Sequence, residues 1–329
     1  MTKKDTITLE SIRKPVAKEL VTFDQVLRDS LRSSIPLVRL LERYLVRQQG
    51  KRVRPLLVLL SAKLCGGITE RTFRGASFIE ILHIATLIHD DVVDDADLRR
   101  GAASINAIWK NKVAVLMGDY LLSRILLLAL HNQDIDFLET TSIVGKQMTE
   151  GELLQVQKSR QLNTDEETYF EIISGKTAEL FAACAKIGAA SATSDPAVQI
   201  ALYEYGKKIG IIFQISDDIL DYTGHRSIMG KPIAADIKEK KVTLPLIGAL
   251  KNVDSATGKK IILKIKNGAS PRDIQQIVKF VHQNNGIAYS LQKAESIAQE
   301  AIEHLAIFED SPAKQSLIDF VTYVLNRSN

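Results

Sequence analysis

The sequence predicts an all-α protein, and two features of the chain support this prediction. Only 8 of the 329 residues are proline, and residues 56–195 contain none. Because proline breaks helices, such a stretch suits long helical segments. Apolar residues within it recur at helical spacing, as Phe78, Leu82 and Ala85 do. We see no alternating strand pattern bounded by tight-turn dipeptides.

Short polar or glycine-rich breaks mark where the helices should begin and end. In chain order the expected breaks are Cys65–Gly67, Arg100–Gly101, Gln133–Asp134, Gln161–Asp165, Ser194–Pro196, Tyr222–His225 and Gly268–Pro271. Thr164 or Asp165 should cap the helix that follows it. No stretch is typical of an interdomain linker and no internal repeat is visible. We therefore expect one domain over residues 1–329, with a flexible tail over 1–10.

Composition narrows the class of protein. Hydrophobic residues make up 45% and charged residues 25%, as in soluble globular proteins. With 43 basic and 39 acidic residues, the net charge of +4 argues against a nucleic-acid partner. The two cysteines fit a reducing compartment, and no apolar stretch follows the first residues as in a secretory signal. The most apolar window, Val113–Leu130, is interrupted by Asp119 and Arg124, so we expect a cytoplasmic protein.

Two acidic clusters of identical spacing follow apolar helical sequence. Asp90–Asp94 and Asp217–Asp221 both read Asp-Asp-x-x-Asp. The first and last aspartates of each cluster should share a helix face, where like charges repel. Hard carboxylate oxygens suit Mg²⁺, which takes one or two of them and leaves its other positions to water and phosphate. One such cluster could be a solvated helix end, but two copies favour metal binding. Transition metals fit less well, because His89 is the only imidazole beside either cluster.

Basic residues lie close to both clusters. Three cations in Lys51–Arg54 precede an apolar helix expected over Leu56–Leu64, and Lys176-Thr177 should enter another over Ala178–Ala190. Further cations are Arg99, Arg100, Lys231 and the run Lys238–Lys241. Helix N-termini and arginine side chains both suit phosphate. Each cation alone fits surface charge, but together they predict phosphate-binding patches.

His83 lies seven residues before Asp90, on the same expected helix face, with Thr86 between them. A histidine in apolar helical sequence is usually a core residue, whereas its place on this face favours a diphosphate contact. Both interpretations stay open from the sequence.

The ordered set of motifs resembles the trans-isoprenyl diphosphate synthases, or polyprenyl synthetase family, and most of all their long-chain octaprenyl and heptaprenyl types. The matching pieces are Gly50–Pro55, His83, Asp90–Asp94, Arg99–Gly101, Gly118-Asp119, Gly151-Glu152, Lys176-Thr177, Gln214, Asp217–Asp221, Lys231, and Lys241 with Thr243–Pro245. The sequence departs from the family at Ala102–Ser104, where a proline is common, and at Asp95, which extends the first cluster.

The resemblance implies long, mostly antiparallel helices around a deep central cavity, usually in a homodimer. It implies Mg²⁺-dependent, head-to-tail 1′-4 condensation of isopentenyl diphosphate onto an allylic diphosphate such as farnesyl or geranyl diphosphate, with about three metal ions. The metal ligands would be Asp90, Asp94, Asp217, Asp218 and Asp221. The catalytic set would comprise Asp90, Asp91, Asp94, Arg99, Lys176, Asp217, Asp218 and Lys241. The allylic diphosphate would contact Arg99, Lys176, Thr177, Gln214, Lys231 and Lys241. The isopentenyl diphosphate would contact Lys51, Arg54, His83 and Arg100.

Small side chains before the first cluster bear on product length. Ala85 and Thr86 lie five and four residues before Asp90, where short-chain members of the family often carry an aromatic residue. Leu82 would lie deeper, with Met148 facing it from another helix. The resemblance then implies a product of about C30 to C50, held in a dry channel because water would quench the carbocation, and used for quinone side chains. Alternatively, the two residues are small only for helix packing.

Four other functions compete with this one. A short-chain farnesyl or geranylgeranyl synthase shares every motif except the channel residues. A class I terpene cyclase would have an altered second cluster and no isopentenyl site, and a head-to-head synthase would have different acidic motifs. A non-enzymatic subunit of a heteromeric synthase would have degraded clusters, whereas both are intact here. Transient membrane contact could accompany release of so apolar a product, although no motif indicates it.

Overall fold

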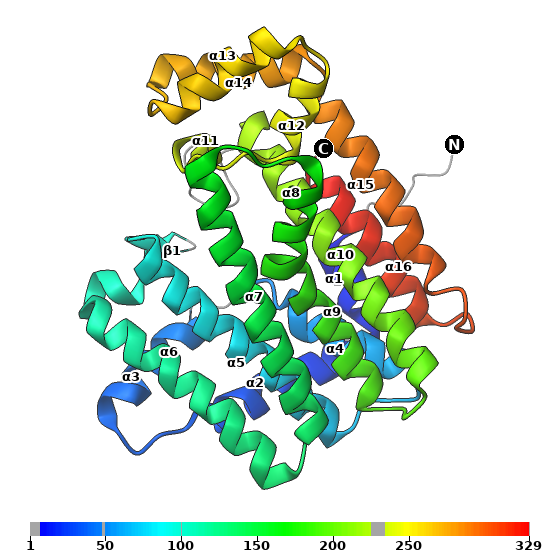
Figure 1. Cartoon of the computed structure of the whole chain (residues 1–329). Helices are drawn as coiled ribbons and strands as arrows, with labels where there is room; N and C mark the ends of the chain where they lie inside the picture. Colours follow the sequence, from blue (N-terminus) through cyan, green and yellow to red (C-terminus); the bar gives the residue numbers. More distant parts are fainter. Residues whose placement is uncertain (1–6, 48–49, 100, 225–233, 329) are drawn as a thin grey trace. The chain divides into compact units, whose positions relative to one another are not determined.

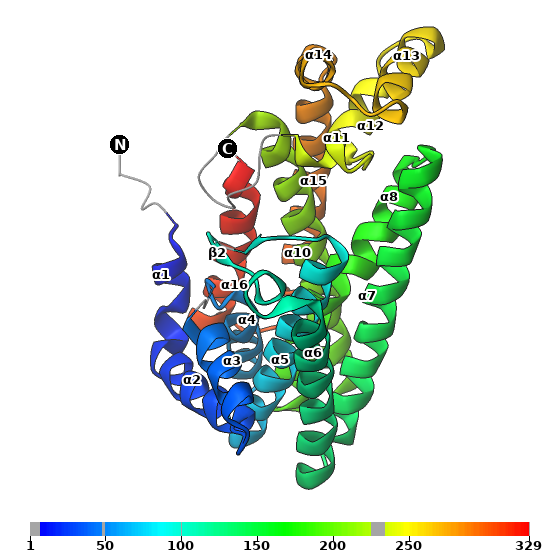
Figure 2. The ribbon, with the colours of Figure 1, turned by 90° about the vertical axis from the view of Figure 1, so that its left-hand side faces the viewer.

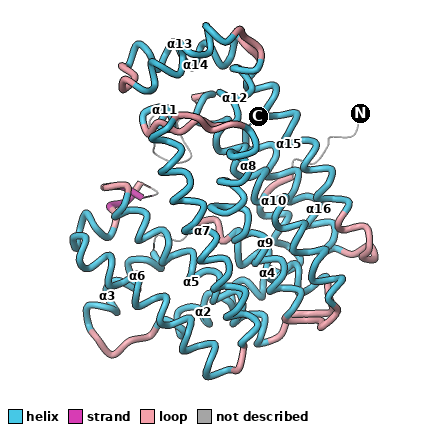
Figure 3. Tube along the Cα trace, in the orientation of Figure 1, coloured by secondary structure: helices cyan, strands magenta, loops and turns pink. Residues whose placement is uncertain are grey.

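The computed structural model describes residues 7–47, 50–99, 101–224 and 234–328, and it confirms the all-α fold (Figures 1 and 3). The helices are α1 (Leu9–Arg13), α2 (Ala17–Leu31), α3 (Pro36–Arg47), α4 (Val53–Leu64), α5 (Glu70–Val93), α6 (Ile105–Asn132), α7 (Ile135–Gln161), α8 (Glu166–Ile173), α9 (Glu179–Ala190), α10 (Pro196–Thr223), α11 (Ala235–Lys238), α12 (Leu244–Lys251), α13 (Ser255–Lys266), α14 (Pro271–Gln283), α15 (Gly286–Glu303) and α16 (Pro312–Leu325). Short 3₁₀ turns cover Lys14–Val16 and Asn326–Ser328, and a π-helical turn covers Ser174–Ala178.

The predicted breaks agree with the helix ends, with three differences. α4 begins at Val53 rather than Leu56, so Arg54 lies inside its first turn. Strands β1 (Leu98–Arg99) and β2 (Ala102–Ala103) form an antiparallel ribbon, which is too short to give an alternating pattern in the sequence. α1 begins at Leu9, where Thr8 caps it, so the expected tail over 1–10 ends in a helix.

The chain forms two compact units. Unit 1 comprises Met1–Gly145, Ala183–Tyr203 and Ile307–Leu317, and unit 2 comprises Lys146–Ala182, Glu204–Ala306 and Ile318–Asn329. The first acidic cluster therefore belongs to unit 1 and the second to unit 2.

In unit 1, α5 packs against α2, α4 and α6 (Figure 2). Neighbours on several sides explain why α5 is apolar around most of its circumference, with Phe78, Ile81 and Ala85 all fully buried. Among the helices that the structure describes, one, α6, is long and apolar enough to cross a membrane by length and composition alone. Only 33% of its most apolar 18-residue window is buried. The part of α6 that faces away from α5 is therefore largely apolar and uncovered.

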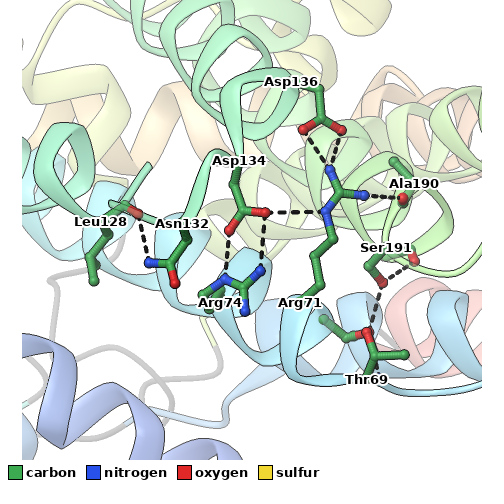
Figure 4. Close-up of polar contacts among 11 residues, drawn as sticks. Thr69, Arg71, Arg74, Leu128, Asn132, Asp134, Asp136, Ala190 and Ser191 are labelled. Atoms are coloured by element: carbon green, nitrogen blue, oxygen red, sulfur yellow. Dashed lines mark hydrogen bonds and ion pairs between the residues drawn. The ribbon is translucent and has the colours of Figure 1, made fainter. Parts of the chain in front are cut away.

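Ion pairs fix the beginning of α5 in unit 1 (Figure 4). Arg71 donates to Asp134 at 3.1 Å and to both oxygens of Asp136 at 2.6 Å. Its remaining nitrogen donates to the backbone oxygen of Ala190 at 2.6 Å. Arg74 forms a second pair with Asp134, at 2.6 and 3.2 Å. Two arginines thus neutralise the buried Asp134 and connect α5 to the α6–α7 turn and the end of α9.

In unit 2, the C-terminal helices α12, α14 and α15 pack on one another, and α12 also contacts α8. Glu166, the first residue of α8, accepts hydrogen bonds from Lys251, from Lys293 at 2.9 Å and from Tyr289. Burial opposes ionisation of Glu166, but these three donors prevail and lower its pKa to about 2. The C-terminal third of the chain therefore holds α8 in place.

Candidate active site

Each acidic cluster lies at the C-terminal end of a long helix. Asp90 and Asp91 belong to the last turn of α5, and the backbone N–H of Asp94 donates to the oxygen of Asp90 at 2.8 Å. Asp217, Asp218 and Asp221 occupy the last two turns of α10. The negative end of the helix dipole disfavours acidic side chains there, by about 0.3–1 kcal/mol each. A chain that keeps acids against this preference at two helix ends is typical of a binding site.

The second aspartate of each cluster differs from the others. Asp91 is 5% and Asp218 4% exposed, whereas Asp90, Asp94, Asp217 and Asp221 are half-buried or exposed. At 3.6 residues per turn, the first and fifth positions share a face and the second lies about 100° away. The spacing thus presents two carboxylates outward and directs one into the protein.

In unit 1, the inward aspartate holds an arginine. Arg99 on β1 donates to one oxygen of Asp91 through Nε at 2.8 Å and through Nη2. Asn106 of α6 donates to the backbone oxygen of Asp91 at 3.1 Å. Arginine carries five N–H donors, so Arg99 keeps others with which it can bind phosphate. Asp91 therefore positions Arg99 beside the first cluster.

In unit 2, the inward aspartate is enclosed by two donors. Tyr169 of α8 donates to Asp218 at 2.6 Å, and Gln214 donates to its other oxygen at 2.8 Å. Burial and then nearby Asp236 raise the pKa of Asp218, while the hydrogen bonds from Tyr169 and Gln214 oppose this rise. Neither Tyr169 nor Asp236 was identified from the sequence. Tyr169 precedes Lys176 by seven residues, but helical spacing alone does not show that it contacts α10.

The last aspartate of the second cluster caps the short helix α11. Its two carboxylate oxygens accept the N–H groups of Ala235 at 3.0 Å and Asp236 at 3.2 Å. α11 leads to Lys241, whose backbone N–H donates to the oxygen of Asp236 at 2.8 Å and whose side chain pairs with Glu239. Asp221 therefore connects the second cluster to the segment that carries Lys241.

Lys176 and Thr177 lie in the π-helical turn that joins α8 to α9, and not at a helix N-terminus as the sequence suggested. Lys176 pairs with Glu152 of α7, and Thr177 donates to Gln214 at 2.8 Å. Gly151 permits this close approach, because a Cβ there would lie 2.7 Å from the backbone nitrogen of Lys176. Single π-turns inside helices are frequent at functional sites.

The first basic patch lies in unit 1. Arg54 and His83 are 2.9 Å apart, from Nη1 to Nε2. Since arginine only donates, the Nε2 atom of His83 must accept, which requires a neutral ring in the tautomer that carries its hydrogen on Nδ1. Arg52, between the two predicted phosphate ligands Lys51 and Arg54, instead pairs with Glu80 and Asp24. The buried His83 is thus both part of the core and a partner of a predicted ligand.

The predicted chain-length residues lie on α5 and α7. Leu82 and Ala85 are buried, and Thr86 is half-buried with its hydroxyl donating to the backbone oxygen of His83 at 2.9 Å. The Thr86 side chain therefore satisfies its polar atom within its own helix. Met148, on α7, is half-buried and belongs to unit 2. Arg100 and Lys231 lie outside the described residues.

The carboxylates suit a metal that needs few protein ligands. In the part of the chain that the structure describes, no three histidine, cysteine, aspartate or glutamate side chains converge to hold an ion. Mg²⁺ usually takes one or two carboxylates and completes its octahedron with water and substrate phosphate. Asp90, Asp94 and Asp217 suit that requirement, whereas Asp221 could offer only the lone pairs that remain after it caps α11.

An all-α protein with paired aspartates at two helix ends, accompanied by basic side chains, has the features expected of a prenyl-transferring enzyme. The family model described as polyprenyl synthetase matches residues 36–281. The chain therefore belongs to the polyprenyl synthetase family, and it is a prenyltransferase.

Individual relatives agree with this assignment. An all-trans-nonaprenyl-diphosphate synthase (geranyl-diphosphate specific) of Rhodobacter capsulatus is 35% identical, over 97% of this chain and 98% of the relative. A short chain isoprenyl diphosphate synthase of Methanothermobacter thermautotrophicus is 32% identical, over 93% and 95%. The crystal structure of a decaprenyl diphosphate synthase from Rhodobacter capsulatus matches with a TM-score of 0.91 and 31% identity, over 98% of this chain and 100% of that one.

Proposed function

We propose that this protein condenses isopentenyl diphosphate onto an allylic diphosphate until it has made an all-trans polyprenyl diphosphate of about C30 to C50, which serves for quinone side chains. The observation that carries the long-chain part is the pair of small side chains, Ala85 and Thr86, one turn before the first cluster on α5. Relatives of both long-chain and short-chain type are similar to this chain, so product length must be measured.

The outward aspartates are suited to magnesium. Asp90 and Asp94 would hold ions at the end of α5, and Asp217 and Asp221 at the end of α10. When bound, magnesium stabilises the negative charge that develops on the departing diphosphate.

The cations bind and orient the two substrates. Arg99, held by Asp91, and Lys176, held by Glu152, would bind the allylic diphosphate together with Thr177, Gln214, Lys231 and Lys241. Lys51, Arg54, His83 and Arg100 would bind the isopentenyl diphosphate. The allylic C–O bond breaks to give an allylic cation and free diphosphate. The isopentenyl double bond attacks this cation to form the new C–C bond, and the departing diphosphate accepts the proton that is then lost. The apolar face of α5 excludes water from the cation.

A product assay tests this function. Purified protein receives Mg²⁺, labelled isopentenyl diphosphate and farnesyl diphosphate, and chain length is read after dephosphorylation. A ladder that extends beyond C25 supports the long-chain assignment. Products that stop at C15 or C20 from a shorter primer would make it a short-chain synthase. No incorporation with any primer would overturn the proposed function for this chain by itself, and would indicate a missing partner subunit or a different reaction.

The channel along α5 predicts that Ala85→Phe shortens the product. A benzyl side chain at this position would block a prenyl chain that extends along α5, while the diphosphate ligands remain in place. The measurement is the product distribution together with the rate of the first condensation. Leu263→Phe, an exposed position on α13, is the matched control and should leave both unchanged. A product distribution unaltered by Ala85→Phe would contradict the channel.

The uncovered apolar face of α6 supports a homodimer. Leu116, Leu126, Leu127 and Leu130 are all exposed along this helix. Exposed apolar area of this extent on one helix is typical of an interface between copies of a chain. We expect a particle of twice 36.5 kDa by light scattering. Leu126→Glu combined with Leu130→Glu should give a monomer, whereas Leu263→Glu should not. A wild-type monomer would exclude this interface.

The same proposal places the protein in the cytoplasm, with transient membrane contact when the apolar product leaves. This contact rests only on the apolar character of the product. Co-sedimentation of the protein with lipid vesicles, with and without product bound, is its direct measurement.

A further inference from the structure

A buried tyrosine contacts the second acidic cluster from a different helix. Tyr169 is 3% exposed and donates to Asp218 at 2.6 Å. A buried phenol needs a hydrogen-bond partner, and a bond to a carboxylate is stronger than one between neutral groups. The contact joins residues 49 positions apart in the chain. It therefore fixes the end of α10 against α8.

Hydrogen bonds continue from Asp218 to the π-helical turn. Gln214 donates its amide nitrogen to Asp218 at 2.8 Å, and its amide oxygen accepts the hydroxyl of Thr177 at 2.8 Å. The carboxylate oxygen must accept, so the amide nitrogen faces Asp218 and the amide oxygen faces Thr177. Because Asp218 can only accept as a carboxylate, it fixes which group donates in each of these hydrogen bonds, from Tyr169 and Gln214 to Asp218 and from Thr177 to Gln214.

This series leaves Gln214 with one donor that can face a ligand. One of its amide hydrogens is directed at Asp218 and the other can point to a phosphate oxygen, whereas the only hydroxyl hydrogen of Thr177 is taken up by Gln214. If the Gln214 amide turned over, Thr177 would have to reorient. The arrangement is stable only while Asp218 is held in place.

We propose that Tyr169 is a positioning residue for the transfer reaction, and that it acts by holding Asp218 so that Asp218 orients Gln214 and Thr177. In this role Asp218 serves as an acceptor for protein donors, rather than as a magnesium ligand like Asp217. The inference rests on the proposed function, in which Gln214 donates to the allylic diphosphate and Thr177 lies beside it.

The first test is Tyr169→Phe, which removes one hydroxyl and keeps the ring. We expect kcat/KM for the allylic diphosphate to fall about 10- to 100-fold, the effect of losing a hydrogen bond to a charged group. The KM for isopentenyl diphosphate and the Mg²⁺ concentration for half-maximal rate should not change. Tyr205→Phe is the matched control, because Tyr205 is also a fully buried tyrosine in unit 2. Equal losses in both variants would overturn the inference in favour of a general effect on folding.

A double-mutant cycle separates positioning from stability. In a Gln214→Leu background the series is already broken, so Tyr169→Phe should cost little more. If the double variant lost kcat/KM by the full product of the two single losses, Tyr169 would not act through Gln214. That result would overturn the inference.

A magnesium titration tests the role of Asp218. Asp217→Asn should raise the Mg²⁺ concentration for half-maximal rate, whereas Asp218→Asn should leave it unchanged and reproduce the KM pattern of Tyr169→Phe. A rise of equal size in both variants would make Asp218 a metal ligand. Failure of the wild-type protein to incorporate isopentenyl diphosphate would overturn the proposed function itself. An active wild type with a normal Tyr169→Phe variant would overturn only the inference.

Discussion

Asp90→Asn lowers turnover about 10²- to 10³-fold, the loss expected when one group that stabilises developing charge is removed. Asparagine keeps the size of the side chain and removes the charge that would hold magnesium at the end of α5. Stability should not fall, because the substitution also removes an acid from the negative end of a helix dipole. Steady-state rates at saturating Mg²⁺ and the melting temperature are the two measurements.

The neighbouring Asp95 offers a matched control. It is exposed, extends the cluster by one position and has a positive φ of 48°, a conformation that asparagine tolerates. Asp95→Asn removes the same charge from almost the same place, so its turnover should stay near that of the wild type. Equal losses in the two variants would indicate a general effect of local charge, and near-full activity of Asp90→Asn would exclude Asp90 as a metal ligand.

Asp134→Ala should destabilise the fold by about 3–5 kcal/mol, because it leaves two partly buried arginines without their shared partner. Arg71 and Arg74 both pair with Asp134, whose side chain is 3% exposed. The shift should appear as a lower melting temperature and a lower urea midpoint, measured on protein of the same oligomeric state.

Asp136→Ala provides the comparison for that loss. Asp136 also pairs with Arg71, but its side chain is 52% exposed. Exposed ion pairs contribute about 0–1 kcal/mol, so this variant should unfold close to the wild type. Similar shifts for the two variants would mean that burial does not determine the strength of this network.

Much of the fold and part of the site could be predicted from the sequence. Helix ends carry local signals, so Asp165 as a cap and Pro196 as a first residue were both predictable. Two Asp-Asp-x-x-Asp clusters were visible because their spacing is local. The contact of Tyr169 with Asp218 spans 49 positions, and no periodicity reports it. The different roles of the aspartates within one cluster likewise depend on which neighbours each one meets.

The π-helical turn at Ser174–Ala178 changes which face of the chain is buried on either side of it. The N–H of Glu179 donates to the oxygen of Ser174, five residues earlier, so the turn holds one residue more than a regular helix. Residues after it are rotated by about 100° relative to the register of α8. α8 and α9 can therefore bury different faces while the backbone runs on without a loop. The extra residue therefore shifts the helical register between α8 and α9. The half-buried Lys176 and Thr177 lie within the turn where this shift occurs.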